Sequence, residues 1–287
     1  MSQVNWDQFQ PESMKKKVDY HEYMASRKWS YTKDTMRLRN PKCERCFCND
    51  SKIIHHLTYK NVGYEKRQEL MAVCRECHDF NHAKKGLDPL SNTSFFFAGK
   101  IKALAGDWRL PFFDNEFKDR YVSIKGTTFG FPYSSLPSMP VVNVSAKELN
   151  FKYSGPFYSD CHGGLDIGNG HGDYSKIVSA CEFWVLRADA LFAFIDDLTA
   201  FGSIAEIAFA HKADKPILLA YSSEDIAKEM NFITSMAKRA TINNDPIDAF
   251  IDLCEGKPSN MIEGTKTFHI YEDYQLVVCN GSDYFEP

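Results

Sequence analysis

The chain has 287 residues, of which 44% are hydrophobic and 25% charged, and its formal net charge is −4. At roughly 100–200 residues per domain, this length accommodates one large domain or two small ones. No apolar run approaches the roughly 18–20 residues of a membrane span, and the first residues lack the basic-then-apolar pattern of a secretory signal. We therefore expect a cytoplasmic protein, and we exclude a membrane protein, a disordered chain and a secreted mini-protein.

Charge is distributed unevenly along the chain. Residues 1–90 contain 17 Lys and Arg against 12 Asp and Glu, whereas residues 91–287 contain 17 against 26. A basic front on an acidic body indicates that only the N-terminal part meets a polyanion, and DNA is the expected partner. A basic surface that is merely solvated explains the charge equally well.

The cysteines show the same division, since five of the nine lie between Cys43 and Cys77. The pairs Cys43-x-x-Cys46 and Cys74-x-x-Cys77 have the spacing of a closed tetrahedral Zn–thiolate site, which is structural. A small module with little core needs such a metal to fold. Cys48 is left over, and the four cysteines elsewhere are expected to be small buried hydrophobes.

Histidines gather beside these cysteines. Residues 53–59, Ile-Ile-His-His-Leu-Thr-Tyr, predict a strand on which His55 and His56 point to opposite sides. His78 and His82 follow the second cysteine pair, and on a helix their spacing of four places them on one face. The pattern predicts that one of the two adjacent histidines is a metal ligand and that the other has a different role.

These motifs resemble the HNH (ββα-metal) endonuclease family. The likeness is carried by the His-His strand, the C-x-x-C pairs and Glu69-Leu70 ahead of the Cys-His element, together with the lead-in segment Tyr20 to Trp29. It covers roughly residues 15–85 and implies a small zinc-stapled HNH domain over residues 1–85.

The resemblance also implies roles for individual residues. His56 would be the general base that activates water, while His55, His78 and His82 would hold a divalent cation (Mg, Mn, Zn or Ni) that polarises the scissile phosphate. Glu69 occupies the position of the family's central Asn, which orients the base and stiffens the loop. The alternative is a zinc module that binds DNA without cutting it.

Residues 86–93 are rich in turn formers and predict a linker. Beyond them, residues 94–287 alternate between apolar strand patterns (94–100, 183–185, 190–195 and 215–221) and helical patterns (204–211 and 222–238). Such alternation predicts an α/β domain with a mostly parallel, flavodoxin-like or Rossmannoid sheet. Ligands of such sheets bind beyond the carboxyl ends of the strands, so we expect the chemistry in the loops after Phe97, Tyr153 and Ile195.

These loops contain the polar groups that a nucleotide site needs. A Gly-Ser turn leading into a helix offers free backbone N–H groups to an anion or a hydroxyl-rich group. The predicted substrate-binding residues are Gly99, Lys100, Asp107, Trp108, Arg109, Gly155, His162, Gly202 and Ser203.

Taken together, the loops resemble the nucleoside 2-deoxyribosyltransferase family over roughly residues 92–287. The most specific segment is Gly202-Ser203-Ile204-Ala205-Glu206-Ile207, with Asp189 ahead of it and Lys215-Pro216 behind it. The resemblance implies that Glu206 is the nucleophile that attacks C1′ of a (deoxy)ribosyl group and expels the base.

The same resemblance implies further roles. Asp189, or the pair Asp196 and Asp197, would orient the sugar or protonate the base, Trp108 would stack on a base, and Arg109 would pair with a phosphate. The family has an Asp six residues before the nucleophile, where this chain has Ala200. This difference favours hydrolysis of a nucleoside, nucleotide, NAD or nucleic-acid N-glycosidic bond over base exchange.

Three functions are therefore weighed. The first is a bifunctional enzyme with an HNH nuclease and a Glu-dependent N-glycosidase, similar in its Gly-Pro-Phe and His-Gly loops to bacterial antiphage effectors that deplete nucleotides. In the second, only the C-terminal domain is catalytic and the zinc module binds DNA or a partner. In the third, a DNA nuclease carries a second domain that senses a nucleotide. Homo-oligomerisation is plausible in all three, and no membrane association is expected.

Overall fold

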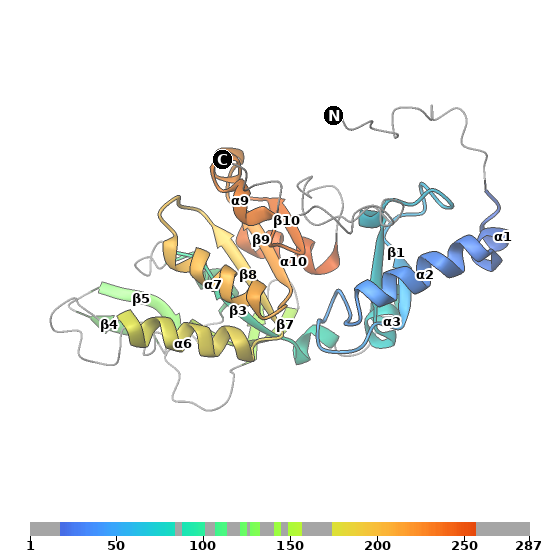
Figure 1. Cartoon of the computed structure of the whole chain (residues 1–287). Coiled ribbons are helices and arrows are strands. Elements are labelled where there is room, and N and C mark those ends of the chain that lie inside the picture. Colours follow the sequence, from blue (N-terminus) through green and yellow to red (C-terminus); the bar gives the residue numbers. More distant parts are fainter. Residues whose placement is uncertain are drawn as a thin grey trace.

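The computed structural model describes residues 18–83, 88–100, 107–113, 121–124, 127–132, 141–144, 149–156 and 174–256. They form an N-terminal unit built on a small hairpin and a C-terminal unit built on a larger sheet (Figure 1). Within the described residues, no helix is both long and apolar enough to cross a membrane.

The N-terminal unit is a two-stranded hairpin with helices before and after it. Its elements are α1 (Tyr20–Ala25), α2 (Arg27–Arg39), β1 (Ile53–His56), the 3-10 helix η3 (Arg67–Glu69), β2 (Leu70–Val73) and α3 (Arg75–Ala83). The side chains of Asp19 and Ser26 accept backbone N–H groups and so begin α1 and α2. β1 and β2 pair antiparallel, with His56 opposite Leu70.

The alternation of side chains along the hairpin separates two small cores. Ile54, Leu70 and Ala72 face α2 and pack with Trp29 and Met36. The alternate residues pack on the other side, in a cluster that contains the four cysteines of the C-x-x-C pairs, Met71, Val73 and Ile53. The period of two therefore gives the hairpin one face for α2 and another for α3 and the cysteines.

The C-terminal unit has a six-stranded sheet in the order β10-β9-β8-β3-β7-β6. Its strands are β3 (Ser94–Ala98), β6 (Val141–Val144), β7 (Leu149–Tyr153), β8 (Ala190–Ile195), β9 (Ile217–Tyr221) and β10 (Arg239–Ile242). Five strands are parallel, and the edge strand β6 pairs antiparallel with β7. β4 (Tyr121–Ile124) and β5 (Thr127–Pro132) form a separate hairpin.

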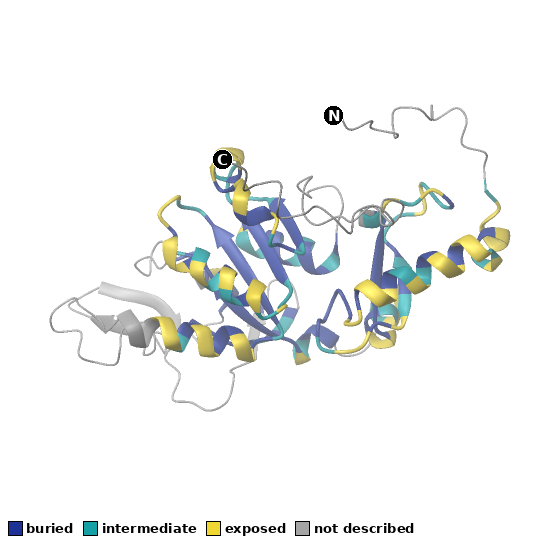
Figure 2. Cartoon of the chain, viewed as in Figure 1, coloured by how far each residue is buried: buried dark blue, intermediate teal, exposed yellow. Residues whose placement is uncertain are grey.

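Helices cover this sheet, and its central strands are buried (Figure 2). Phe250 packs against Phe95, Phe97 and Phe192, so its helix covers that face of the sheet. Figure 1 shows α6 and α7 in front of the sheet. The helices of this unit are η4 (Pro89–Asn92), η6 (Leu110–Phe112), α6 (Tyr174–Arg187), α7 (Phe201–Lys212), α8 (Glu224–Glu229), α9 (Asn231–Thr234) and α10 (Pro246–Glu255).

The predicted α/β class is confirmed, and so are the strands predicted near residues 94–100, 190–195 and 215–221. The strand predicted at residues 183–185 is wrong, because these residues lie inside α6. The buried residues Cys181, Trp184, Val185 and Ala188 have helical spacing, which a window of three apolar residues conceals. The helix predicted over 222–238 is divided into the short helices α8 and α9.

Candidate metal centres and active site

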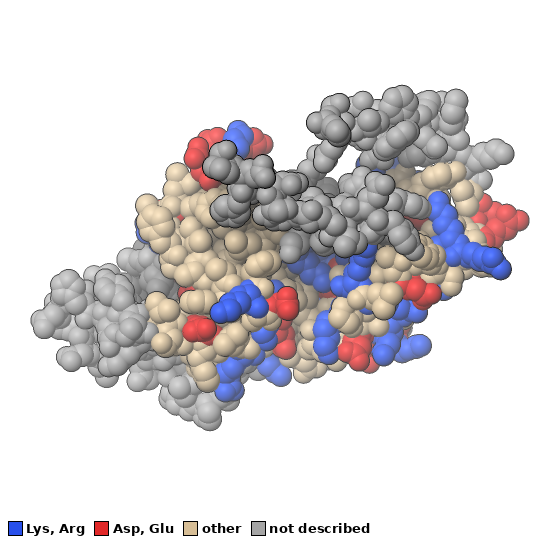
Figure 3. All heavy atoms as spheres, viewed as in Figure 1, with Lys and Arg blue, Asp and Glu red and all other residues tan. Residues whose placement is uncertain are grey.

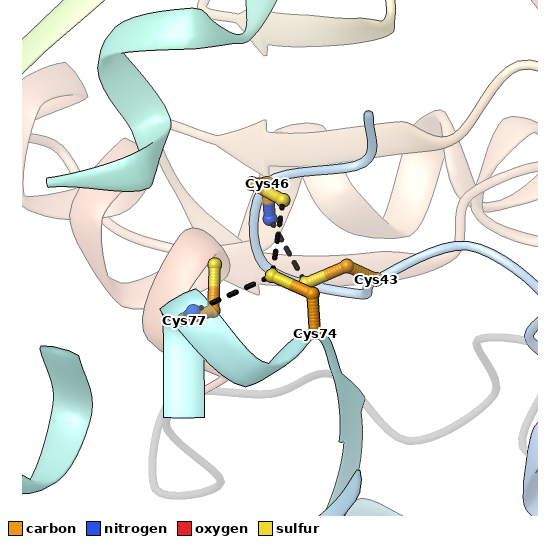
Figure 4. A group of neighbouring side chains, drawn as sticks. All are labelled: Cys43, Cys46, Cys74 and Cys77. Carbon is orange, nitrogen blue, oxygen red and sulfur yellow. Dashed lines mark hydrogen bonds between the residues drawn. The ribbon is translucent and has the colours of Figure 1, made fainter. Parts of the chain in front are cut away.

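Four cysteine side chains converge between β2 and the start of α3. The sulfur atoms of Cys43, Cys46, Cys74 and Cys77 lie within 4.8 Å of one another, and all four residues are buried (Figure 4). The Sγ atoms of Cys46 and Cys74 are 3.8 Å apart. The chain thus contains a closed, buried four-thiol cluster with the dimensions of a metal site.

Backbone N–H groups are directed at the sulfur atoms. The N–H groups of Arg45 and Cys46 lie 3.4 Å and 3.5 Å from Cys43 Sγ, and the N–H of Cys77 lies 3.4 Å from Cys74 Sγ. Such donors stabilise thiolate charge, which four thiolates around a divalent cation need. Cys48 is outside the cluster and half-buried.

A second cluster consists of three histidines, on the face of the hairpin that also carries α3 and the cysteines. One ring nitrogen each of His55, His78 and His82 lies within 4.8 Å of the others, and the ring centroids are 4.5–5.5 Å apart. β1 supplies the first ring and α3 the other two, one turn apart. Burial and the neighbouring rings lower the pKa of His55 to about 4, so its imidazole is neutral near pH 7. The predicted ligand trio is therefore brought together.

His56 does not face this trio. Its ring is stacked between Trp29 and Tyr59, with centroids 4.8 Å and 5.3 Å away, and its side chain is only 3% exposed. Its Nε2 lies 3.0 Å from Glu65 Oε1. The predicted general-base role needs correction, because a buried ring on the opposite side of β1, engaged by a carboxylate, is not placed to activate water at the histidine trio.

Glu69 braces the loop between the two strands. Its carboxylate accepts hydrogen bonds from the Asn61 side chain at 2.5 Å and from the Lys66 backbone N–H at 2.8 Å. The residue is 8% exposed, so it stiffens the loop and does not contact a substrate. The predicted loop-stiffening part of its role therefore agrees with these contacts, and its part in orienting the catalytic base stays a prediction.

The first cysteine turn also contacts the C-terminal unit. Glu44 lies between Cys43 and Cys46, and its Oε1 accepts a hydrogen bond from the Arg67 guanidinium at 2.5 Å. The same oxygen is 3.6 Å from Lys238 Nζ and 3.8 Å from Arg239 Nη2. The side chain of Glu44 is 1% exposed, and the three cations hold its pKa at about 2 although burial opposes them. Arg239 also donates to the Glu44 backbone carbonyl at 3.1 Å.

The predicted linker takes part in the same contact. Asp88 receives two hydrogen bonds from the Arg45 guanidinium, at 2.6 Å and 2.7 Å, and its side chain begins η4. Leu90 is buried, and the Thr93 hydroxyl donates to the Cys46 carbonyl at 2.5 Å. Residues 88–93 are therefore packed between the two units and are not a free tether.

In the C-terminal unit, polar side chains meet where β3 and β8 end. Lys100 donates to Asp197 and to Thr199, at 2.7 Å in both cases. Lys100 and the hydrogen bonds from Thr199 lower the pKa of Asp197. Asp196 and Asp197 thus lie at the predicted carboxyl edge, while the Lys100 ammonium is already engaged by an acid.

Three of the predicted substrate contacts are wrong because the side chains are enclosed. The Arg109 guanidinium is fully buried and donates to Asp107 and to the carbonyls of Phe97 and Gly99. Trp108 is 6% exposed and stacks on Phe97. Arg109 and Asp107 therefore tie the chain to the end of β3. The Arg109 guanidinium is engaged inside the protein and cannot bind a phosphate, and the Asp107 carboxylate is engaged by Arg109. The buried Trp108 ring has no open face on which a base could stack.

Gly99 is needed for the same packing. A Cβ atom on Gly99 would lie 2.4 Å from Trp108 Nε1 and 2.8 Å from the Phe194 carbonyl oxygen. The residue thus permits close approach inside the protein and does not leave room for a bound phosphate.

Asp189 also has a different role from the predicted one. Its carboxylate accepts from the backbone N–H and the hydroxyl of Ser94, at 2.9 Å and 2.7 Å. Both residues stand at the beginning of parallel strands, which is the edge opposite the carboxyl ends. Asp189 therefore pins the start of β3 to that of β8 and is not part of a site with Asp196 and Asp197.

Glu206 lies in the second turn of α7 and is half-buried. Burial, with the adjacent Cys181, raises the pKa of Glu206 well above its usual range, and the Arg109 guanidinium opposes that rise. Gly202 and Ser203 are in the first turn of the same helix, the former exposed and the latter buried. A protonated carboxyl at this position is suited to donating a proton, whereas nucleophilic attack requires its ionised form.

Two predicted substrate-binding residues remain, Gly155 and His162, and the structure describes only the first. Gly155 follows β7, has a φ of 123°, and its carbonyl accepts from the Phe97 N–H at 2.8 Å. It thus bridges the ends of β7 and β3. His162 lies outside the described residues.

Three residues of these sites could not be identified from the sequence motifs: Glu44, Glu65 and Cys181. Glu44 stands between two cysteine ligands, where an acidic residue could have suggested a buried charge. Glu65 and Cys181 are distant in sequence from His56 and Glu206, so only tertiary contact reveals them.

Comparison with known proteins adds no relative. No family model, curated protein or solved structure matches the chain.

Proposed function

We propose that the N-terminal unit is a metal-dependent DNA nuclease domain of the HNH (ββα-metal) kind, stapled by a structural zinc. The convergence of His55, His78 and His82 carries this proposal. Three imidazoles that are not fully buried are typical of a catalytic metal site, whereas four buried thiols are typical of a structural zinc.

The chain's own groups would divide the work. The three histidines would hold the cation, and the hairpin and α3 fix their rings relative to one another. When bound, the cation would polarise the scissile phosphate and stabilise the leaving oxygen. α2 contributes five Lys and Arg against one Asp, which supports DNA binding by the N-terminal unit, and Figure 3 shows Lys and Arg side chains on the visible face of this unit, with Asp and Glu among them.

The experiment is plasmid nicking with the full chain in Mg²⁺, Mn²⁺, Zn²⁺ or Ni²⁺, beside His55→Ala, His78→Ala and the control His211→Ala on the exposed side of α7. We expect the first two variants to lose nicking while they keep the tightly bound zinc equivalent. Absence of nicking by the wild type in every metal would refute the nuclease and leave a zinc module that binds DNA. His56→Ala is included because we expect nicking to survive this change, whereas loss of nicking with the metal content unchanged would return the base role to His56.

A second activity is proposed for the C-terminal unit: Glu206-dependent cleavage of an N-glycosidic bond in a nucleoside, nucleotide or NAD. Two observations support it. The parallel strands, numbered within this unit, follow the order 2-1-3-4-5 of flavodoxin-like sheets, whose ligands bind beside the first and third strands. A half-buried carboxyl with a strongly raised pKa, next to this edge, is typical of functional sites.

Chromatographic detection of free base after incubation with nucleosides, nucleotides, NAD and DNA tests this activity. We expect release by the wild type and none by Glu206→Gln, which keeps the size of the side chain. If the rate of base release rises as pH is raised through the pKa of Glu206, the ionised carboxylate acts as the nucleophile. If the rate falls over the same range, Glu206 acts as a proton donor. Equal release by wild type and Glu206→Gln would refute the assignment, and silence from both would favour a nucleotide-sensing domain.

A further inference from the structure

Exposed tyrosines gather around the loop that joins β1 to η3. Tyr59 and Tyr64 belong to this loop and are 55% and 41% exposed, and Tyr20 at the start of α1 is 39% exposed. The rings of Tyr20 and Tyr59 are 6.0 Å apart in an edge-on arrangement. These aromatic side chains are accessible at one end of the N-terminal unit.

Tyr59 is the outer ring of a stack of three. Trp29 and His56 are nearly parallel at 4.8 Å, and His56 and Tyr59 are nearly parallel at 5.3 Å, with interplanar angles of 21° and 22°. Trp29 is buried, so the stack is anchored in the core and ends at the surface. An aromatic ring with a supported inner side and an accessible surface has the form on which a nucleobase stacks.

Hydrogen bonds hold the loop in this shape. Glu65 binds His56 through one oxygen and the Tyr23 hydroxyl through the other, at 3.0 Å and 2.8 Å. Glu69 binds Asn61 and the Lys66 N–H on the far side of the loop. Tyr59 is therefore presented by a loop that is ordered before any ligand arrives, which lowers the entropic cost of binding.

The charges beside the ring suit a phosphate backbone. Lys60 and Lys28 are exposed. Lys28 Nζ donates one hydrogen bond to the Gly63 carbonyl at 2.5 Å and lies 4.9 Å from the centre of the Tyr64 ring, which leaves its other N–H groups for a phosphate. The one acid of the loop before Glu69, Glu65, has a side chain that is 4% exposed and faces inward. Tyr20 by contrast stands beside Asp19 and close to Glu22, so its surroundings favour phosphate less than those of Tyr59.

We propose that Tyr59 stacks on an unpaired base of single-stranded DNA, with Lys60 and Lys28 contacting the adjoining phosphates. The inference rests on the proposed nuclease and names its substrate class. Tyr59 follows His55 by four residues, a separation of at most about 14 Å along the chain. Because Tyr59 stacks on His56, on the side of β1 opposite the histidine trio, a single strand held on Tyr59 would have to pass the end of β1 to reach the trio.

The test measures binding without cleavage. Fluorescence anisotropy of labelled oligothymidylate is recorded with the full chain and no added divalent cation. Tyr59→Ala is expected to weaken binding by about 5- to 150-fold, the range for loss of one base stack. Tyr59→Phe should bind like the wild type. Tyr59→Leu, which still covers His56 but has no flat ring, should resemble the alanine variant, and Tyr31→Ala, at an exposed tyrosine of α2, is the control.

Two further measurements separate stacking from a structural effect. A 2-aminopurine base in the oligonucleotide should lose fluorescence on binding to the wild type and not on binding to Tyr59→Leu. Lys60→Gln should reduce the slope of log Kd against log salt concentration by about 0.7, the value for one phosphate contact of a single strand. The 2-aminopurine fluorescence should still be quenched on binding to this variant. Equal affinity of wild type and Tyr59→Leu, or an equal loss on a blunt duplex of the same length, would overturn the proposal.

Nicking is scored separately, so the two proposals fail in different ways. If no metal supports nicking but binding still depends on Tyr59, base stacking on Tyr59 is supported and the nuclease is refuted. If nicking depends on His55 while Tyr59→Leu binds normally, the nuclease is supported and base stacking on Tyr59 is refuted.

Discussion

The Glu44→Gln substitution probes the contact between the cysteine turn and the C-terminal unit. It removes the negative charge that faces Arg67, Lys238 and Arg239, and it leaves the length of the side chain unchanged. The amide also offers a weaker acceptor to the Ala72 N–H, which lies 2.6 Å from Glu44 Oε2. We expect marked destabilisation, because removing one partner of a buried ionic cluster leaves uncompensated charge in the interior.

Two estimates of the magnitude agree. Loss of one partner from a buried ion pair costs about 3–5 kcal/mol. Independently, the pKa of Glu44 is lowered from 4.5 to about 2, and at about 1.4 kcal/mol per unit this linkage contributes about 3 kcal/mol at neutral pH. Since the folded-state pKa is the lower one, this contribution is complete above about pH 5 and is lost as pH falls toward 2. Less than half of it, roughly 1.4 kcal/mol, is left at pH 3.

The assay is urea unfolding at a series of pH values, with Glu76→Gln as the matched control. Glu76 stands in the second C-x-x-C turn but is exposed, so its substitution should change the unfolding free energy by less than about 0.5 kcal/mol. The wild type and both variants keep the four cysteines, so loss of a bound metal in acid affects all three proteins alike. The difference in unfolding free energy between wild type and Glu44→Gln therefore reports the contribution of the Glu44 carboxylate. A difference below about 1 kcal/mol at pH 7, or one that does not shrink below pH 5, would refute the reasoning.

Three other predictions follow from the geometry. Cys74→Ser should lose the tightly bound zinc equivalent, measured by emission spectrometry, and should unfold the hairpin in far-UV circular dichroism, whereas retained metal would exclude a four-thiol site. Gly99→Ala should lower the melting temperature by several degrees, because its Cβ would overlap Trp108 Nε1 and the Phe194 carbonyl, and an unchanged value would contradict this packing. Gly202→Ala, whose Cβ meets nothing within 4 Å, should instead be neutral or stabilise α7 by up to about 1 kcal/mol in the same measurement.

The convergence of the four cysteines and of the three histidines could be predicted from sequence because local spacing determines much of their geometry. A C-x-x-C turn brings two sulfur atoms together whatever surrounds it, and His78 and His82 share a helix face by periodicity alone. Alternation on β1 likewise predicted that His55 and His56 point apart, as they do. What each histidine contacts depends on α2 and on the loop carrying Glu65, and this could not be obtained from spacing.

In the C-terminal unit, strands could be predicted and roles could not. Buried runs such as Ala190–Ile195 are apolar throughout, which is typical of a parallel strand between two layers of helices. Arg109 and Asp189 are polar residues that the fold uses internally, one to tie a loop to β3 and the other to join the starts of two strands. A sequence does not distinguish a charge that is paired inside the protein from one that awaits a ligand, because the difference lies in contacts with distant residues.

The first cysteine turn links the two units through adjacent residues. Glu44 and Arg45, between Cys43 and Cys46, send their side chains to Arg239 and to Asp88 respectively. Filling the four-thiol cluster with a metal fixes the backbone of this turn, and so fixes the positions of both charges at the interface. The free energy of metal binding therefore also stabilises the contact between the units, because neither charge can keep its partner if the turn unfolds. A zinc in this position would thus do more than stabilise a small hairpin: it would hold the histidine trio and Tyr59 in a fixed relation to the carboxyl edge of the sheet.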